Sequence, residues 1–232
     1  MRIILALAFA LVALTGSPAV AATRTYTVTS FDRIRVEGPY AVSVSVGGAS
    51  FARASGTQRA IDAVSLRVEG RTLYVRADRS SWGGNPDQPA GPVTISVGTP
   101  ELAHASLNGA GSVAIDRLRG LAFSLLVSGS GSASIGQADL DTLRVSVLGS
   151  GGTRLAGRAK QFTALIRGAG SLDAASLATT DATLSAFGPA TLRAAAANSA
   201  KITATGTASV SLEGGGACEL KVSGSATVTG CR

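Results

Sequence analysis

Few side chains in this sequence have the type and spacing that chemistry requires. The 232 residues contain one histidine, His104, and two cysteines, Cys218 and Cys231. A metal site built on imidazole groups needs more than one histidine. No nucleophile motif marks a serine and an aspartate as partners of His104, so we predict that it is a surface residue and not a general base. The sequence predicts no catalytic residue, no cofactor-binding residue and no metal site.

The acidic residues are the remaining candidates, because two carboxylates at a defined separation can cleave a glycosidic bond. Asp139 and Asp141 lie on the same side of the chain if their stretch is a strand. Four other acids fall at different phases of the repeat described below and form no row: Asp116, Asp173, Asp181 and Glu213. We therefore predict that the protein is not an enzyme, with a polysaccharide-acting enzyme as an alternative.

The first residues have the pattern of a secretory signal peptide. Arg2 supplies a positive charge, residues 3–14 form an apolar run, and Ala19-Val20-Ala21 is a cleavage site. The apolar run is shorter than the about 20 residues that span a bilayer; a retained anchor is the alternative. We predict a signal peptide over residues 1–21, a mature chain without a transmembrane segment, and a periplasmic, secreted or outer-surface location.

Export makes a disulfide between Cys218 and Cys231 the expected state, because exported compartments are oxidising. In the chain-entropy model a loop of this size contributes about 3 kcal/mol to stability. The repeat places Cys218 on an inward row, whereas Cys231 has an outward phase. Two free thiols are therefore the alternative.

The charge of the chain points away from nucleic acid. Lys and Arg number 21 against 14 Asp and Glu, a net charge of +7, and this charge is spread along the chain. Aromatic residues make up 4% of the sequence, and no basic run is interleaved with them. Nucleic-acid binding is not predicted, while weak attraction to anionic envelope polymers is compatible with the charge.

A repeat of 18–20 residues organises the second half of the chain. The strands of this repeat must position the candidate histidine, acidic and cysteine side chains named above. A Gly-x-Gly-Ser turn, or a degraded form of it, begins at seven glycines: Gly109, Gly129, Gly149, Gly168, Gly188, Gly206 and Gly224. On both sides of each turn apolar residues alternate with polar ones, which predicts two short strands with one buried face each. Periods of this length indicate a solenoid. We predict an all-β fold, a single-domain parallel β-helix with coils of about 18–20 residues.

The same alternation predicts which side chains are inside. Positions two, four and six before each glycine, and four after it, form the inward rows, as for Leu143, Val145 and Val147. The regular repeats cover residues 105–232, and residues 22–104 form the N-terminal cap and opening strands of the same continuous domain. The alternating strands expected in this first part are Tyr26–Val28, Ile34–Val36, Val42–Val46, Val64–Val68, Leu73–Val75 and Val93–Val97.

Four large apolar residues fall on outward positions of successive coils: Leu126, Leu148, Leu165 and Phe187. The strand spacing makes them neighbours on one face, and together they would expose a few hundred Å². We predict that this patch docks a second copy of the chain or an envelope partner. In the alternative, the N-terminal segment or the Gly- and Pro-rich loop of residues 80–92 covers it. That loop carries the only tryptophan, Trp82, and is itself a candidate functional loop. In the alternative, which the ready burial of aromatic rings favours, Trp82 folds back over the flank of the solenoid.

Two segments and the serial turns resemble one protein family. Residues 31–44 (FDRIRVEGPYAVSV), residues 68–75 (VEGRTLYV) and the Gly-x-Gly-Ser turns are similar to the autotransporter adhesin head domain, also called the GIN domain. The resemblance covers roughly residues 27–229. It implies an exported β-helical domain of the cell envelope and brings no established catalytic residues. Because the sequence ends at Arg232 without a translocator, we do not expect a self-secreting autotransporter.

These observations lead to one functional prediction. We expect an exported, non-catalytic envelope protein that acts as an adhesin-like or structural binding module, with an envelope protein or a polysaccharide as partner. The alternative is a polysaccharide-binding module or a polysaccharide-acting β-helix enzyme.

Overall fold

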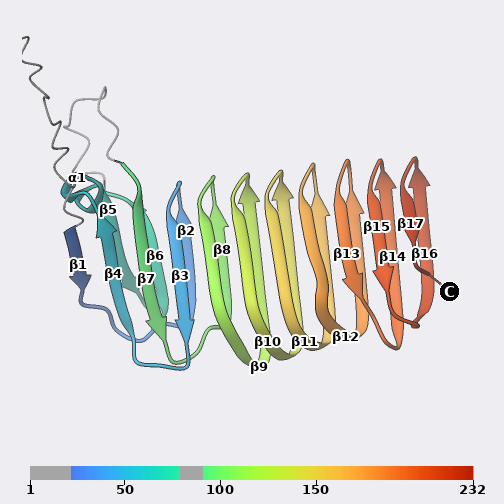
Figure 1. Ribbon diagram of the computed structural model, residues 1–232, viewed down its shortest axis with the longest axis horizontal. Helices are drawn as coiled ribbons and strands as arrows, with labels where there is room; N and C mark the ends of the chain where they lie inside the picture. The colour runs from blue at the N-terminus through green and yellow to red at the C-terminus, as the bar shows by residue number, and fades with distance from the viewer. Residues whose placement is uncertain (1–21, 79–90, 232) are drawn as a thin grey trace, which may run out of the picture.

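The structure is a computed structural model that describes residues 22–78 and 91–231; the predicted signal peptide and Trp82 lie outside the described residues. In the described part, seventeen strands join into one sheet that winds around a core as a β-solenoid (Figure 1). Successive coils pair parallel and in register. The all-β parallel β-helix predicted from the repeat is therefore confirmed.

Four long strands form the middle of the solenoid, and each runs from one glycine turn to the next: β9 (Ser112–Gly129), β10 (Ser132–Gly149), β11 (Gly152–Arg167) and β12 (Ser171–Phe187). Equivalent residues of successive repeats lie side by side. Leu143, for example, is paired with Phe123 on one side and Phe162 on the other. Pairing in register on both sides of each turn thus places each inward row along the axis of the solenoid, and irregularities between Ile135 and Ala138 and between Arg154 and Ala156 absorb the differences in repeat length.

The later coils are broken at the corner into shorter strands: β13 (Thr191–Ala195), β14 (Ser199–Gly206), β15 (Ser209–Glu213), β16 (Ala217–Gly224) and β17 (Thr227–Thr229). β14 and β16 extend the stack of the strand segments that precede each glycine turn, which we call the pre-turn side. β13, β15 and β17 extend the stack of segments that follow the turn, the post-turn side.

The core lies between these two sides and follows the predicted rows. Leu143, Val145 and Val147 are buried, and the later coils narrow around alanines such as Ala182 and Ala200. The last coil differs, because the inward residues of β16 lack a further coil to cover them. Leu220 and Val222, one on each of two predicted inward rows, are 45% and 47% exposed.

The repeated glycines allow the coils to stack closely at the turns. Gly149 has a φ of +113°, and a Cβ atom added there would lie 2.6 Å from the carbonyl oxygen of Gly129. At Gly151 an added Cβ would lie 2.7 Å from the carbonyl oxygen of Gly131. Both glycines of the Gly-x-Gly turn are thus required by close backbone approach between neighbouring coils.

The first part of the chain contains β1 (Ala22–Tyr26), β2 (Arg33–Glu37), β3 (Ala41–Val46), β4 (Phe51–Gly56), α1 (Gln58–Asp62), β5 (Val64–Glu69), β6 (Thr72–Ala77), β7 (Val93–Thr99) and β8 (His104–Asn108). Three of its pairings are antiparallel: β1 with β4, β4 with β7, and β5 with β6. The Thr57 side chain caps α1 by accepting a hydrogen bond from the N–H of Ala60, at 3.2 Å.

The opening strands do not stack in sequence order. β2 lies between β6 and β8, and β3 lies between β7 and β9. The first coil, formed by β2 and β3, is therefore the second layer of the solenoid. β6 and β7 form the layer on its N-terminal side, and the chain then crosses to β8 and β9 on its other side. The repeat pattern does not predict β4 or α1, and the first strand, expected at Tyr26–Val28, is β1, which ends at Tyr26. These short elements lack the glycine signature that set the register elsewhere.

Candidate binding surface

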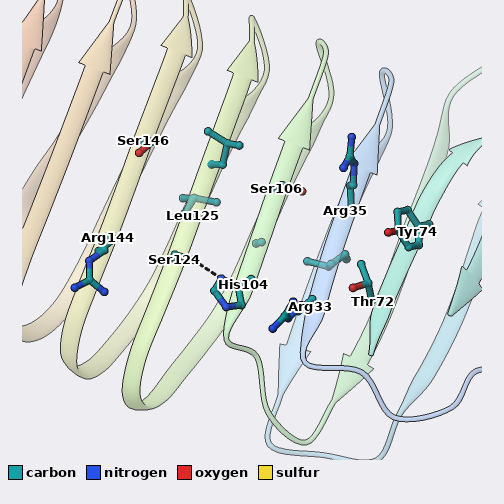
Figure 2. Close-up of a pocket in the computed structure, with 13 residues that line it drawn as sticks. Arg33, Arg35, Thr72, Tyr74, His104, Ser106, Ser124, Leu125, Arg144 and Ser146 are labelled. Carbon is teal, nitrogen blue, oxygen red and sulfur yellow. Dashed lines mark hydrogen bonds between the residues drawn. The ribbon is translucent and has the colours of Figure 1, made fainter. Parts of the chain in front are cut away.

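The outer surface of the pre-turn side carries a shallow depression of about 530 Å³ (Figure 2). Its polar lining comes from five strands, β2, β6, β8, β9 and β10: Arg33, Arg35, Thr72, Tyr74, His104, Ser106, Ser124, Arg144 and Ser146. The out-of-order position of β2 brings Arg33 and Arg35 beside residues that are about 70 to 110 positions later in the chain. The depression is thus a product of the fold and not of any contiguous motif.

Strand alternation aims the side chains of the depression outward. Arg33 and Arg35 alternate with Ile34 and Val36, which are buried. β2 is in register with β8, so that Arg33 is paired with His104 and Arg35 with Ser106. The alternation of arginine with branched apolar residues was a usable sequence signal for these two outward cations.

The electrostatics of the depression favour an anion. No carboxylate lies among its lining residues, while three guanidinium groups do. Arg35 is paired with Glu37 outside the depression, at 2.6 Å, and Arg33 lies 4.0 Å from Asp32. Among the described residues, no carboxylate forms an ion pair with Arg144. Guanidinium groups bind carboxylate, phosphate and sulfate groups through charge-assisted hydrogen bonds.

His104 lies in this surface and not in a catalytic constellation. It occupies an outward position of β8, and its Nδ1 atom is hydrogen-bonded to the hydroxyl of Ser124 on the next coil. The contact joins two outward side chains of neighbouring strands in one row. No carboxylate is paired with its ring in the described structure.

The four predicted apolar residues continue from the depression along the same face. Register pairing places them alternately in two outward rows, as a zigzag over four coils: Leu126, Leu148, Leu165 and Phe187. We call this set the apolar zigzag. Leu126 also lines the depression, so the cationic and apolar surfaces are continuous. Leu126 and Leu148 are 36% and 37% exposed, whereas Leu165 and Phe187 are half-buried.

One cation lies within the apolar zigzag. Arg167 is paired with Leu148 on one side and Phe187 on the other. Its guanidinium carbon lies 5.4 Å from the centre of the Phe187 ring. The described N-terminal strand β1 pairs with β4 on the post-turn side and does not cover the zigzag. Trp82, the other predicted cover, lies outside the described residues.

The carboxylates that could have supported hydrolysis are each held by a cation. Asp139 is bound by Arg158 through two hydrogen bonds of 2.7 and 2.8 Å, and Asp141 pairs with Lys160 at 2.7 Å. The hydrogen bonds from Arg158 lower the pKa of Asp139. A general acid in glycoside hydrolysis needs the opposite shift.

The other acids examined in the sequence lie apart from this pair. Asp173 pairs with Arg154 at 3.8 Å, Asp116 accepts a hydrogen bond from the N–H of Val46, and Asp181 accepts bonds from Asn198 and Ser199. Within residues 22–78 and 91–231, no group of three or more His, Cys, Asp or Glu side chains is placed to hold a metal ion.

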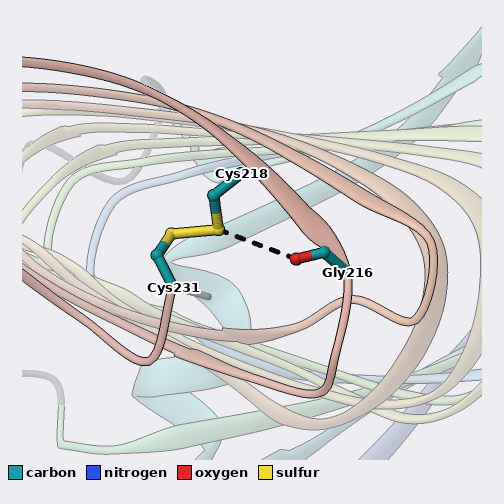
Figure 3. The surroundings of a disulfide bond; sticks show 3 residues. All are labelled: Gly216, Cys218 and Cys231. Carbon is teal, nitrogen blue, oxygen red and sulfur yellow. Dashed lines mark hydrogen bonds between the residues drawn. A yellow bond between two sulfur atoms is a disulfide. The ribbon is translucent and has the colours of Figure 1, made fainter.

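Cys218 and Cys231 are joined by a disulfide at the C-terminal end of the solenoid (Figure 3). Their Cα atoms are 5.7 Å apart. The repeat phase of Cys231 does not apply, because Gly230 has a φ of +84° and turns the chain out of β17. Cys231 therefore lies across the end of the coil, within reach of the inward-facing Cys218.

Comparison with known protein families identifies the family of this chain. The sequence model of the family described as "Putative auto-transporter adhesin, head GIN domain" matches residues 30–216. The chain belongs to this family. The matched region contains the depression and the apolar zigzag, and it ends immediately before β16. No curated protein matches the chain.

Several solved structures share this fold. A putative adhesin from Bacteroides fragilis is 21% identical with a TM-score of 0.80, over 90% of this chain and 95% of that one. A putative lipid binding protein from Parabacteroides distasonis is 18% identical, with a TM-score of 0.71 over 90% and 95%. A putative adhesin from Parabacteroides merdae is 19% identical, with a TM-score of 0.70 over the same shares. At these identities the likeness establishes the fold alone.

The chain is thus a β-helical member of the GIN domain family. The one helix among the described residues, α1, is far too short to cross a membrane.

Proposed function

We propose that this GIN domain is an exported, non-catalytic binding module that docks an envelope protein on the outer surface of its pre-turn side. The observation that carries the proposal is the continuity of the arginine-lined depression with the apolar zigzag. The exposed Leu126 and Leu148, with the half-buried Leu165 and Phe187 beside them, fit an apolar protein surface. The guanidinium groups beside it select a partner that presents acidic side chains next to that surface.

A pull-down from envelope extract tests this proposal with the purified mature protein as bait. The Leu148→Ser/Phe187→Ser variant removes half of the apolar zigzag, and Leu121→Ser is the matched control, because Leu121 is 77% exposed and lies outside the zigzag. We expect the partner to be lost with the double variant and retained with the control, while both variants keep their thermal stability. Equal capture by all three proteins would contradict docking at the zigzag.

The same double variant also separates docking from an internal role. A large fall in thermal stability without any change in capture would mean that the zigzag is covered by another part of the chain. Loss of self-association, measured by light scattering, would instead identify a second copy as the occupant of the zigzag.

A polysaccharide is the second candidate partner, and the depression is the observation that favours it. Three arginines, His104 and the Tyr74 ring line one hollow, with the guanidinium of Arg76 5.8 Å from that ring. An acidic polysaccharide should then bind with an affinity that falls as salt rises. The Arg33→Ala/Arg144→Ala variant should lose this binding, and Arg154→Ala on the post-turn side should not. Release of new reducing ends from the polysaccharide would overturn the non-catalytic proposal.

Export is part of the proposal and has a direct test. The predicted cleavage site gives a mature chain that begins at Ala22, the first residue of β1. N-terminal sequencing of the protein from the periplasm or the medium should therefore start at Ala22 and lack residues 1–21. A protein that keeps Met1 in the cytoplasm would contradict export.

A further inference from the structure

The C-terminal end of the solenoid exposes a free strand edge. The N–H of Ala217 donates to the carbonyl of Asn198 at 2.9 Å, which turns the backbone groups of Ala217 toward β14. Alternation along a strand then turns the N–H and C=O groups of Cys218, Leu220 and Val222 the other way, toward the open end. Among the described residues, β14 is the strand that pairs with β16, and no strand pairs with its outer edge.

The same residues leave the end of the core uncovered. Their side chains point inward, yet Leu220 and Val222 are about half exposed. The residues one coil earlier in the same rows, Ile202 and Ala204, are completely buried. Unpaired backbone groups and uncovered apolar side chains thus coincide on one strand, as they do where another strand is to be added.

We propose that β16 pairs antiparallel with β16 of a second copy, around a two-fold axis that passes through Leu220. In this register Leu220 faces Leu220 of the second copy, and Cys218 faces Val222 in both directions. All three residues have outward backbone groups, so each pair exchanges two N–H···O=C hydrogen bonds. Their side chains join the two cores into one.

The charges of β16 select this register among the symmetric ones. With the axis at Leu220, Glu219 lies directly opposite Lys221 of the second copy, and the reverse pair is identical by symmetry. An axis at Glu219 would place two glutamates opposite each other, and an axis at Lys221 would place two lysines opposite each other. Opposite charges stabilise a cross-strand pair and like charges destabilise it.

The neighbouring coil extends this complementarity. Lys201 is already paired with Glu219 at 3.0 Å on the outer surface of the pre-turn side. Lys221 of the second copy would approach the same carboxylate from its other side, which makes a line of alternating charge across the joint. Among the described residues, Lys221 itself has no carboxylate partner within its own chain.

A second copy joined head to tail is less suited to this end. The N-terminal end is covered by α1 and the antiparallel strands, and its apolar residues Ile61, Val64 and Leu66 are buried. It offers no exposed core against which Leu220 and Val222 could pack. The complementary surface is therefore the C-terminal end of another copy, and the assembly closes as a dimer.

Sedimentation and light scattering on the mature chain test the register through charge changes. Lys221→Glu alone should raise the dimer dissociation constant at least tenfold, because two like-charged pairs replace two opposite ones. Glu219→Lys alone should do the same. Mixing the two variants should give a one-to-one heterodimer, since every cross-strand pair between them has opposite charge. Arg193→Glu, the same charge change on the exposed face of β13, is the control and should leave the dimer intact.

Backbone pairing has its own test. Leu220→Pro removes an N–H that faces the open end and leaves the ladder to β14 intact, so the monomer should fold and the dimer should be lost. Amide exchange at Cys218, Leu220 and Val222 should slow as the concentration of the unaltered protein rises. A protein that stays monomeric at its highest soluble concentration would overturn the proposal. A dimer that survives Lys221→Glu, or a mixture that forms no heterodimer, would also overturn it.

Discussion

The two ends of the solenoid close the same core in different ways. At the N-terminal end, residues 51–69 form β4, α1 and β5. The strands β4 and β5 pair antiparallel with their neighbours, and α1 lies across the end of the core. Ile61 on α1 is completely buried there. At the C-terminal end the last coil keeps the geometry of the coils before it, and Leu220 and Val222 remain exposed.

The difference shows that a parallel coil at the end of a solenoid cannot by itself cover the core or pair its outer edge. The last parallel coil forms backbone hydrogen bonds to its neighbour along one edge, and the backbone groups of its other edge stay unpaired. An antiparallel return with a short helix covers the core at the N-terminal end. The C-terminal end has the Cys218–Cys231 bond, which fixes the coil without covering it. One end is therefore closed by packing, and the other is held covalently and is available for pairing.

The largest contrast is expected between a central and a terminal residue of the inward rows. Leu143→Asp should abolish folding, because it places an unpaired charge in the fully buried core. Leu220→Asp should lower the stability of the monomer by less than about 1 kcal/mol, because water already reaches that side chain in a single chain. Circular dichroism during chemical unfolding measures both. A folded Leu143→Asp protein of unchanged stability would contradict the register of the coils.

A smaller contrast is expected between the two ends themselves. Ile61→Ala should cost about 2–5 kcal/mol, because it leaves a cavity under α1. Val222→Ala should cost well under 1 kcal/mol at an exposed position. If the two truncations cost the same in denaturant melts of the monomer, the ends would be equally packed and the contrast drawn above would be wrong.

The disulfide should act locally at the C-terminal end. The mass of the exported protein should be lower by two hydrogens than that of the reduced chain. The Cys218→Ser/Cys231→Ser variant should lose at most about 3 kcal/mol. Amide exchange should accelerate in β16 and β17 but not in β1 or α1. Alkylation of both cysteines without reductant would show that the bond is absent.

The smallest effect concerns acid at the N-terminal end. Arg24 on β1 binds the carboxylate of Asp62 on α1, and this contact, with a hydrogen bond from Gln58, lowers the pKa of Asp62. A lowered folded pKa means that the contact contributes above the ordinary carboxyl pKa and is lost as pH falls through the folded value. The protection factors of the β1 amides, which correct for the intrinsic exchange rate at each pH, should therefore fall below about pH 4.

Substitution separates this contact from general acid effects. Asp62→Asn should make the protection factors of the β1 amides independent of pH in that range, and Asp139→Asn, on a distant coil, should leave their pH dependence unchanged. If Asp62→Asn keeps the acid response, a different group holds β1 to the end of the solenoid.

The regular coils were predictable because each of them contains a glycine turn from which the register of its strands can be counted. The first glycine of the turn, which has a positive φ, recurs once per coil, and counting from it placed Leu143 and Phe162 inside and Leu148 outside. The same counting placed Leu220 inside, yet its side chain is 45% exposed. The position in a row determines the direction in which a side chain points, but it does not determine whether another residue covers that side chain. Coverage depends on a neighbouring coil.

The candidate surface was only half predictable for a related reason. The apolar zigzag lies within the regular repeats, where one count relates all four residues. The depression depends on β2 lying beside β8, a contact between Arg33 and His104 that no local pattern encodes. Several short alternating strands in residues 22–104 are equivalent by pattern, and only the long-range packing that closes the N-terminal end decides their order.

The position of the disulfide also determines how the GIN domain carries tension. A force applied beyond Cys231 passes through the sulfur–sulfur bond directly to Cys218, at the start of β16. The intervening residues 219–230, which hold roughly 40 Å of extended chain, bear no load. Unfolding from this end must then begin by breaking the hydrogen bonds of Ala217, the residue before Cys218, to the neighbouring coil, and the free edge of β16 keeps its shape while the molecule is pulled.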